Sequence, residues 1–163
     1  MKTLSHLNTK GEAHMVDVSA KEISNRYAKA EGFVLMEAET LRMISEGTAK
    51  KGDVLSVARV AGIMGAKKTS QLIPLCHPLL LNHITIDFTF VSSPTAIKVE
   101  SSIGVDGKTG VEMEALTAVS LACLTIYDML KAVDREMKIT SIHLIEKSGG
   151  QSGSFHFETA YKS

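Results

Sequence analysis

The sequence has few of the features that would tie it to a disulfide scaffold, a membrane or a nucleic acid. Only two of its 163 residues, Cys76 and Cys123, are cysteines, which are too few for a disulfide scaffold. Lys+Arg and Asp+Glu each number 18, and this balance argues against a surface built for DNA or anionic membranes. No charged start followed by an apolar run is found at the N-terminus, and no apolar run reaches membrane length. We therefore expect a cytoplasmic protein without nucleic-acid or membrane partners.

Repeats and low-complexity linkers are also missing, so we expect a single domain over residues 1–163. A domain of this size buries roughly two-thirds of its unfolded surface and needs no covalent or metal staple. Residues 1–25 are polar and irregular, and residues 148–163 form a tail rich in Gly and Ser. Regular secondary structure is therefore expected between these two ends.

In the middle of the chain, segments with the apolar spacing of strands alternate with segments that have the apolar spacing of helices. We expect helices at 38–46, 53–67 and 110–137, and strands at 26–36, 82–91, 97–105 and 139–147. This order matches a ferredoxin-like β-α-β-β-α-β plan, an α+β fold with an antiparallel sheet and helices packed on one face. The other face is then solvated, covered by the N-terminal segment or covered by another subunit.

Two of these elements carry specific expectations about packing. The strand at 82–91 places apolar residues at every second position, namely Ile84, Ile86, Phe88 and Phe90. The helix at 53–67 is expected to begin with Asp53 as its N-cap. Its inner stripe is expected to consist of Val54, Val57, Ala58, Ala61 and Met64.

The stretch LIPLCHPLLL, residues 72–81, sets Cys76 and His77 between two prolines. Pro74 and Pro78 cannot continue a helix and hold the preceding residue extended, so we expect a stiff, irregular connector. It is either a packed linker with a buried cysteine and a satisfied histidine, or a rigid wall that holds an imidazole at a pocket mouth. A metal site is disfavoured, since paired cysteine spacing and a helical His-Glu motif are both missing. No sequence feature supplies a base for a nucleophilic Cys76.

A Gly-rich segment leads into the long helix. Gly107 to Thr109 matches part of a phosphate-binding loop, but the complete motif needs glycine where Ser102 stands. The segment is therefore either a turn and cap or a helix N-terminus that favours an anion. Glu112 and Glu114 follow, where acids face the positive end of the helix dipole. Because they lie roughly 200° apart around a helix, at most one is expected to look straight into a shared pocket if both are helical.

Charged residues also lie near the end of this helix. Asp128 and Lys131 are three residues apart and can touch. They form either a surface ion pair of little energy or a pair partly desolvated by the apolar run before it, which would shift both pKa values. Lys51 is either solvated or placed beside a helix N-terminus where anions are favoured. Glu114 and Asp128 are ~21 Å apart along a helix, so either two sites exist or one site is shared between subunits.

Six segments, in order, resemble the cyclic pyranopterin monophosphate synthase family of molybdenum cofactor biosynthesis. They are GEAHMVDVS (11–19), KGDV (51–54), LIPLCHPL (72–79), TGVEMEALTA (109–118), LTIYDMLKAV (124–133) and KSGGQSG (147–153). Together they cover essentially the whole chain. The resemblance implies a ferredoxin-like fold assembled as a homohexamer, a trimer of dimers, with active sites at a subunit interface. It further implies a lyase that converts a cyclised dihydro-GTP to cyclic pyranopterin monophosphate and releases pyrophosphate.

The same resemblance implies roles for individual residues. Those implied to line the substrate site are Leu75, Cys76, His77, Glu112, Met113 and Glu114. Asp128 is implied to be catalytic, with Lys51 and Lys131 as essential lysines. The lysines suit a triphosphate and a leaving pyrophosphate, and the acids and bases suit proton transfer during ring rearrangement. We expect Lys131 to be the acid/base, tuned toward neutral pH, with Asp128 as its partner and Lys51 acting electrostatically.

No cofactor is required by the sequence, and Mg²⁺ accompanying the substrate phosphates is left open. Two other interpretations are also open. One is a non-catalytic nucleotide-binding module, which would form no product from the purified cyclised nucleotide. The other is a metal-dependent hydrolase that uses Cys76, His77 and the glutamates, which would lose activity with a chelator.

Overall fold

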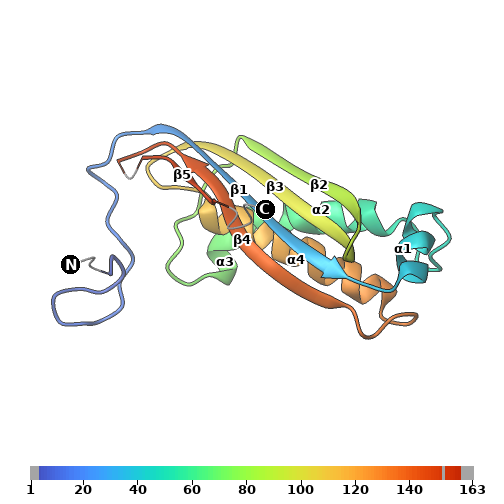
Figure 1. Ribbon diagram of the computed structural model, residues 1–163. Coiled ribbons are helices and arrows are strands. Elements are labelled where there is room, and N and C mark those ends of the chain that lie inside the picture. The colour runs from blue at the N-terminus through green and yellow to red at the C-terminus, as the bar shows by residue number, and fades with distance from the viewer. Residues whose placement is uncertain (1–3, 152, 159–163) are drawn as a thin grey trace.

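The computed structural model describes residues 4–151 and 153–158 and shows a sheet with helices on one face (Figure 1). The strands are β1 (Ser24–Leu35), β2 (His83–Ser92), β3 (Thr95–Gly107), β4 (Lys138–Ser148) and β5 (Phe155–His156). The helices are α1 (Ala38–Ser45), α2 (Val54–Lys67), α3 (Thr69–Leu72) and α4 (Glu112–Leu130). The α+β class is confirmed, with α3 and β5 as additions to the expected elements. Residue 152 and the last part of the Gly/Ser-rich tail, 159–163, lie outside the described residues.

Neighbouring strands of the sheet are all antiparallel, in the order β2-β3-β1-β4-β5. This order fits the ferredoxin-like plan, since β1 lies between β3 and β4 and the β2–β3 hairpin forms one edge. The register of β1 and β3 runs from Ser24 opposite Gly107 to Leu35 opposite Ala96. β1 and β3 are therefore paired along the full length of β1, and α4 packs along this pair of strands.

The core lies between this sheet and α4. Alternate residues of β1 and β3 are fully buried on this side, among them Ala28, Val34, Val99 and Ile103. α4 is apolar nearly all round, which is typical of a helix buried on more than one side. The expectation that no apolar run reaches membrane length was wrong here: among the described residues α4 is the one helix with the length and composition to cross a membrane, and half of it is buried inside the protein. Its place in the core accounts for its apolar composition.

α2 packs on α4 through small residues. Its buried residues are Val54, Ala58, Gly62, Gly65 and Ala66. A Cβ on Gly62 would lie 3.1 Å from the carbonyl oxygen of Ala118, so the two helix backbones approach closely. The expected inner stripe was therefore wrong at Val57 and Met64, which are 47% and 44% exposed. A pattern of large apolar residues does not reveal a contact made by glycine.

α4 ends at Leu130, well before the expected end near residue 137. The buried side chain of Asp134 organises the turn that follows. Its carboxylate accepts hydrogen bonds from the backbone N–H groups of Glu37 and Glu136 and from the hydroxyl of Thr40, at 3.0 to 3.1 Å. These bonds fix the chain after α4 against the start of α1, where a continued helix would not place Asp134.

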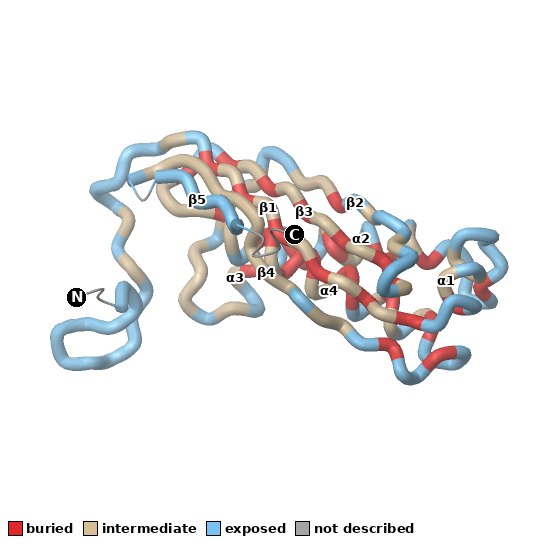
Figure 2. Tube along the Cα trace, viewed as in Figure 1, coloured by how far each residue is buried: buried red, intermediate tan, exposed pale blue. Residues whose placement is uncertain are grey.

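The other face of the sheet carries paired charges. Lys29 and Lys98 contact the carboxylate of Glu100 at 2.8 and 2.6 Å, and His143 lies 3.4 Å from Glu31. The N-terminal segment extends past the end of the sheet and not over this face (Figure 1), and most of it is exposed (Figure 2). Of the three expected alternatives, coverage by the N-terminal segment is therefore excluded.

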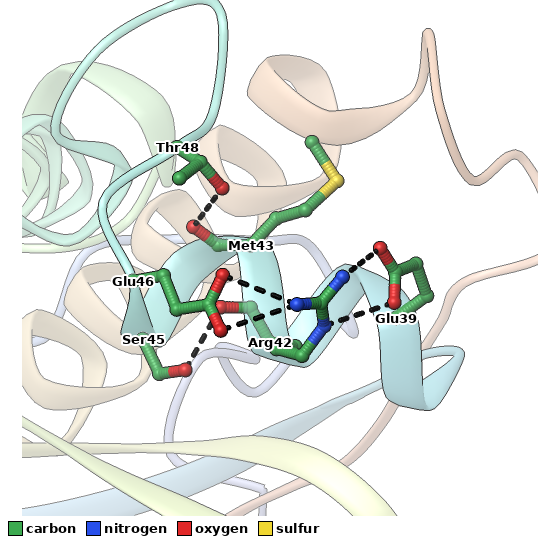
Figure 3. Close-up of polar contacts among 6 residues, drawn as sticks. All are labelled: Glu39, Arg42, Met43, Ser45, Glu46 and Thr48. Carbon is green, nitrogen blue, oxygen red and sulfur yellow. Dashed lines mark hydrogen bonds and ion pairs between the residues drawn. The ribbon is translucent and has the colours of Figure 1, made fainter.

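α1 and the loop after it form one end of the molecule. On the exposed side of α1, Arg42 contacts Glu39 at 2.6 Å and Glu46 at 3.2 Å (Figure 3), and such exposed pairs add little stability. The loop leads to Asp53, whose carboxylate accepts a hydrogen bond from the backbone N–H of Ser56. The predicted N-cap of α2 is thus confirmed, and it holds the loop that carries Lys51.

Candidate functional site

A cavity of about 240 Å³ lies where the start of α4 meets the irregular connector between α3 and β2. The lining includes Leu75, Cys76, His77, Glu112, Met113 and Glu114. The N-terminal segment adds Ser5, His6, Val16, Val18 and Lys21. The structure therefore brings together all six residues that the family resemblance implies for substrate binding.

The connector is irregular, as its two prolines predict, and it places His77 and Cys76 in the cavity wall. The Nε2 atom of His77 lies 2.8 Å from the carbonyl oxygen of Val16. Burial, and then the charge of Glu114, raise the pKa of the Cys76 thiol. A thiol with a raised pKa stays protonated near neutral pH, so Cys76 is not activated as a nucleophile.

Both glutamates of the first turn of α4 line the cavity, although at most one was expected to face it. Glu114 is only 4% exposed, and this burial, together with the charge of Glu112, raises its pKa to about 7. Glu112 accepts a 2.7 Å hydrogen bond from the Nζ of Lys147. Its carboxylate folds back over Gly110, where a Cβ would clash with it. The prediction from the angle between the two residues around the helix was wrong, because the side chain of Glu112 bends back at the start of α4.

The other three predicted residues gather at the opposite end of α4. The Nζ of Lys131 lies 2.6 Å from the carboxylate of Asp128. The Nζ of Lys51 donates a 2.9 Å hydrogen bond to the backbone carbonyl of Asp128 and lies 3.7 Å from its carboxylate. The hydrogen bond between Lys131 and Asp128 lowers the pKa of the aspartate and raises the pKa of the lysine.

This lysine cluster, Lys51, Asp128 and Lys131, is an exposed group and not the partly desolvated pair that was one of the two expectations. The three side chains are 47%, 61% and 53% exposed. The raised pKa of Lys131 is opposite to the tuning toward neutral pH that we expected of an acid/base lysine. The physical reason is that the facing carboxylate stabilises the ammonium and nothing within the described chain removes its water.

α4 keeps the two groups of residues apart. Glu114 and Asp128 belong to one continuous helix and are ~21 Å apart along its axis. Figure 1 shows α1, near the lysines, at one end of an elongated molecule, and α3, near the cavity, at the other end of the helical layer. A single chain therefore does not bring all nine predicted residues into one pocket.

A second hollow adjoins the cavity at Lys21, and the sequence analysis did not foresee Ser24 or Arg26 in its wall. It measures about 600 Å³, and its lining includes Lys21, Ser24, Arg26 and Gly150. Arg26 is only 9% exposed, and its guanidinium lies against the backbone of Gly150, where a Cβ would clash with it. The hydroxyl of Ser24 is buried and has no hydrogen-bond partner among the described residues. Glu22 also lines the hollow, and the guanidinium of Arg26 donates 3.4 Å hydrogen bonds to the backbone carbonyls of Gly107 and Lys108. The hollow thus sets the cations of Lys21 and Arg26 beside one carboxylate.

A sequence signal for this hollow exists in β1. Arg26 shares the inward-facing set of positions with Ala28 and Ala30, and an arginine among buried small residues is unusual. Lys147 gave no such signal, because its contact with Glu112 joins residues far apart in the chain.

Comparison with known proteins identifies the family. Residues 15–150 match the MoaC family. The chain belongs to the MoaC family. Its relatives include proteins named cyclic pyranopterin monophosphate synthase from Methylobacterium sp. (strain 4-46), Cereibacter sphaeroides (strain ATCC 17029) and Dinoroseobacter shibae, each 56% identical to it. The alignments cover 98%, 95% and 97% of this chain and 100%, 98% and 100% of those relatives.

The MoaC match contains both ends of α4, the connector, the loop with Lys51 and Arg26 with most of the hollow around it. The family resemblance inferred from the six motifs is thereby confirmed. In the described part of this MoaC chain, no group of three or more His, Cys, Asp or Glu side chains is arranged to hold a metal ion. A Mg²⁺ ion carried by substrate phosphates needs only one or two protein carboxylates, so this finding leaves the Mg²⁺ expectation untested.

Proposed function

We propose that this protein is a cyclic pyranopterin monophosphate synthase. It would convert 3′,8-cyclo-7,8-dihydroguanosine triphosphate to cyclic pyranopterin monophosphate and release pyrophosphate, an early step of molybdenum cofactor biosynthesis. Relatives 56% identical over nearly the whole chain carry that name. The structural observation that carries the proposal is the cavity where His77, Glu112 and Glu114 converge, beside the hollow that Lys21 and Arg26 line.

The sizes of the two spaces suggest how the nucleotide is divided between them. The cavity, at about 240 Å³, is smaller than the roughly 300–1,000 Å³ typical of a complete ligand pocket. It therefore takes one end of the nucleotide, and its carboxylates and imidazole suit the ring system. The adjoining hollow takes phosphates, because Arg26 and Lys21 supply charged donors there.

The cavity also suits proton transfer. Forming a cyclic phosphate with loss of pyrophosphate requires a substrate hydroxyl to attack the α-phosphorus and lose its proton. The rearrangement of the rings moves further protons. Glu114, with a pKa of about 7, gives or takes a proton near neutral pH. Lys131 is our second acid/base, with Asp128 as its partner, and Lys51 stabilises the departing negative charge.

The lysine cluster joins this chemistry through a neighbouring protomer, in a homohexamer built as a trimer of dimers. The ~21 Å between Glu114 and Asp128 supports this arrangement, because one small substrate does not span it within one chain. The exposure of Lys51, Asp128 and Lys131 leaves them available for such contact. Packing against a second subunit would remove water from Lys131 and lower its pKa, reversing the direction found in the single chain.

The same proposal places the enzyme in the cytoplasm, in keeping with its two free cysteines. Incubation of the purified protein with the cyclised nucleotide tests the activity, with product and pyrophosphate measured by chromatography and mass spectrometry. We expect both products in equal amounts, and loss of both in Lys131→Ala. Binding of the nucleotide without pyrophosphate release would instead identify a non-catalytic binding module. Activity that a chelator abolishes and Mg²⁺ restores would show that the ion accompanies the phosphates.

A further inference from the structure

The imidazole of His77 is held by the backbone of the N-terminal segment. Its Nε2 lies 2.8 Å from the carbonyl oxygen of Val16. A carbonyl only accepts hydrogen bonds, so Nε2 must carry the hydrogen. In a neutral ring the other nitrogen, Nδ1, is then an acceptor. Among the described residues, no second hydrogen bond to this ring is found, so Nδ1 is the nitrogen left for a ligand.

The carbonyl of Val16 belongs to a short segment, residues 16–19, which we call the strap. Its own turn is closed by Asp17, whose carboxylate accepts hydrogen bonds from the backbone N–H of Ser19 at 2.9 Å and from its hydroxyl at 2.6 Å. The Nζ of Lys108 donates a 2.7 Å hydrogen bond to the carbonyl of Ser19. The strap is thus fastened at both ends, to His77 at one and to the turn before α4 at the other.

The strap forms part of the cavity wall, but Asp17 stays outside it. Val16 and Val18 line the cavity. Asp17 lines a separate hollow of about 500 Å³, which Val16, Val18 and His77 also border. Asp17 therefore reaches the cavity only through the backbone that it shapes.

His77 is also constrained from its own backbone. Pro78 follows it directly and holds residue 77 extended. The imidazole is consequently fixed by a stiff backbone at its base and by the strap at Nε2. Such double restraint is how a scaffold orients a side chain for a ligand.

We propose that the carbonyl of Val16 locks His77 in its Nε2–H tautomer, so that Nδ1 meets the substrate as an acceptor, and that Asp17 is a positioning residue acting through the strap. The identity of the ligand rests on the proposed function. The substrate group that fits Nδ1 is a donor, either a hydroxyl or an N–H of the sugar or ring system. An ionised phosphate oxygen does not fit, since it would face the acceptor of a neutral ring.

The same geometry supports proton abstraction by His77. If the Nδ1 lone pair takes a proton from a substrate O–H or N–H, the electron pair of that bond stays on the substrate. The ring then becomes an imidazolium with hydrogen on both nitrogens. Its Nε2–H still donates to Val16, in the way that a carboxylate supports the histidine of a catalytic triad.

Nitrogen NMR of the ligand-free protein, labelled with ¹⁵N-histidine, tests the tautomer directly. The chain has six histidines, and a His77→Gln variant assigns the signals of His77 by their loss. At a pH where the ring is neutral we expect a protonated Nε2 and an unprotonated Nδ1, without the averaging shown by exposed rings. A protonated Nδ1, or signals averaged between the two tautomers, would overturn the proposal.

Three variants of the N-terminal segment test the role of Asp17. Asp17→Ala is expected to give averaged His77 signals and to raise KM about two- to tenfold, the effect of losing one well-placed hydrogen bond. Asp17→Asn keeps an acceptor for Ser19 and should retain both properties. Lys10→Ala, on the same exposed segment, is the matched control. Unchanged His77 signals in a folded Asp17→Ala protein would refute the positioning role.

The two proposals fail separately. The NMR measurement needs no substrate, so a locked Nε2–H tautomer in a protein that makes no product would remove the proposed function and keep the strap. Product formation by a protein whose His77 signals are averaged between the two tautomers would refute the role of the strap and keep the proposed function.

Discussion

Lys51 donates a hydrogen bond of 2.9 Å to the backbone carbonyl of Asp128, and this contact joins the loop before α2 to the last turn of α4. Lys131 lies 2.6 Å from the carboxylate of the same aspartate. His77 and Glu114 lie in the cavity at the other end of that helix. The catalytic proposal therefore depends on two half-sites from different protomers.

Complementation between inactive variants tests the shared site. His77→Ala damages the half-site in the cavity, and Lys131→Ala damages the half-site formed by the lysine cluster. Each variant alone is expected to lower kcat about 100-fold or more. Co-assembled in equal amounts, they should regain about a quarter of wild-type activity, because half of the dimers are mixed and each carries one intact site. The measurement is the rate of pyrophosphate release.

A pair of variants from one half-site provides the control for this experiment. Lys51→Ala and Lys131→Ala both damage the lysine half, so no mixed dimer contains an intact site and no activity should return. Equal recovery in both mixtures, or none in either, would contradict a site shared between protomers.

Glu114 is expected to make stability depend on pH. Burial raises its pKa from 4.5 to about 7, so between these values the folded protein holds a proton that the unfolded chain has released. The free energy of unfolding should therefore be highest below about pH 4.5 and fall as pH rises through 7, by at most about 3 kcal/mol. Glu114→Gln removes this slope and should be about 1–3 kcal/mol more stable than wild type at pH 8.

Urea denaturation at pH 5 and pH 8 measures this effect. Glu136→Gln, at an exposed position, is the matched control and should change stability little at either pH. If Glu114→Gln differed from wild type by the same amount at both pH values, the raised pKa would be wrong.

Asp134 is expected to hold together the turn that follows the lysine cluster. Asp134→Ala removes the acceptor for the backbone N–H groups of Glu37 and Glu136 and for the hydroxyl of Thr40. We expect a loss of about 2–4 kcal/mol in unfolding free energy, since buried donors are left without partners. Asp134→Asn, which keeps one acceptor oxygen, should lose less, and Asp87→Ala at an exposed position almost nothing. Chemical denaturation ranks the three, and equal losses for alanine and asparagine would refute the account.

Gly32 lies where β1 meets α4, and no side chain fits there. A Cβ would come within 2.8 Å of Val119 and 2.9 Å of Ile142, so Gly32→Ala should destabilise the protein by about 1–3 kcal/mol. Gly104→Ala is the control in β3, because its Cβ would make an ordinary contact of 3.4 Å with His83. Thermal unfolding measures the stability of both variants. A Gly32→Ala protein as stable as Gly104→Ala would show that Val119 and Ile142 can move aside to make room for the added methyl group.

Features that depend on neighbours in the chain were predictable from the sequence. Asp53 caps α2, the two prolines keep the connector irregular, and Asp128 meets Lys131 one turn later. Each of these follows from interactions within a few residues. The spacing of apolar residues, every second position in strands and every third or fourth in helices, likewise predicted most of the elements. The six motifs pointed to the family for a related reason, since they are local strings of residues.

Only the tertiary structure decided which distant groups meet and which side chains lose water. It joined Glu112 to Lys147, buried Arg26 beside a hollow, and turned the backbone of Val16 toward His77. It also set opposite environments for two charged residues of one helix, burying Glu114 and leaving Asp128 in solvent. The physical reason is that pKa and contact depend on what the fold packs against a residue, whereas the sequence determines chiefly what each residue does with its nearest neighbours.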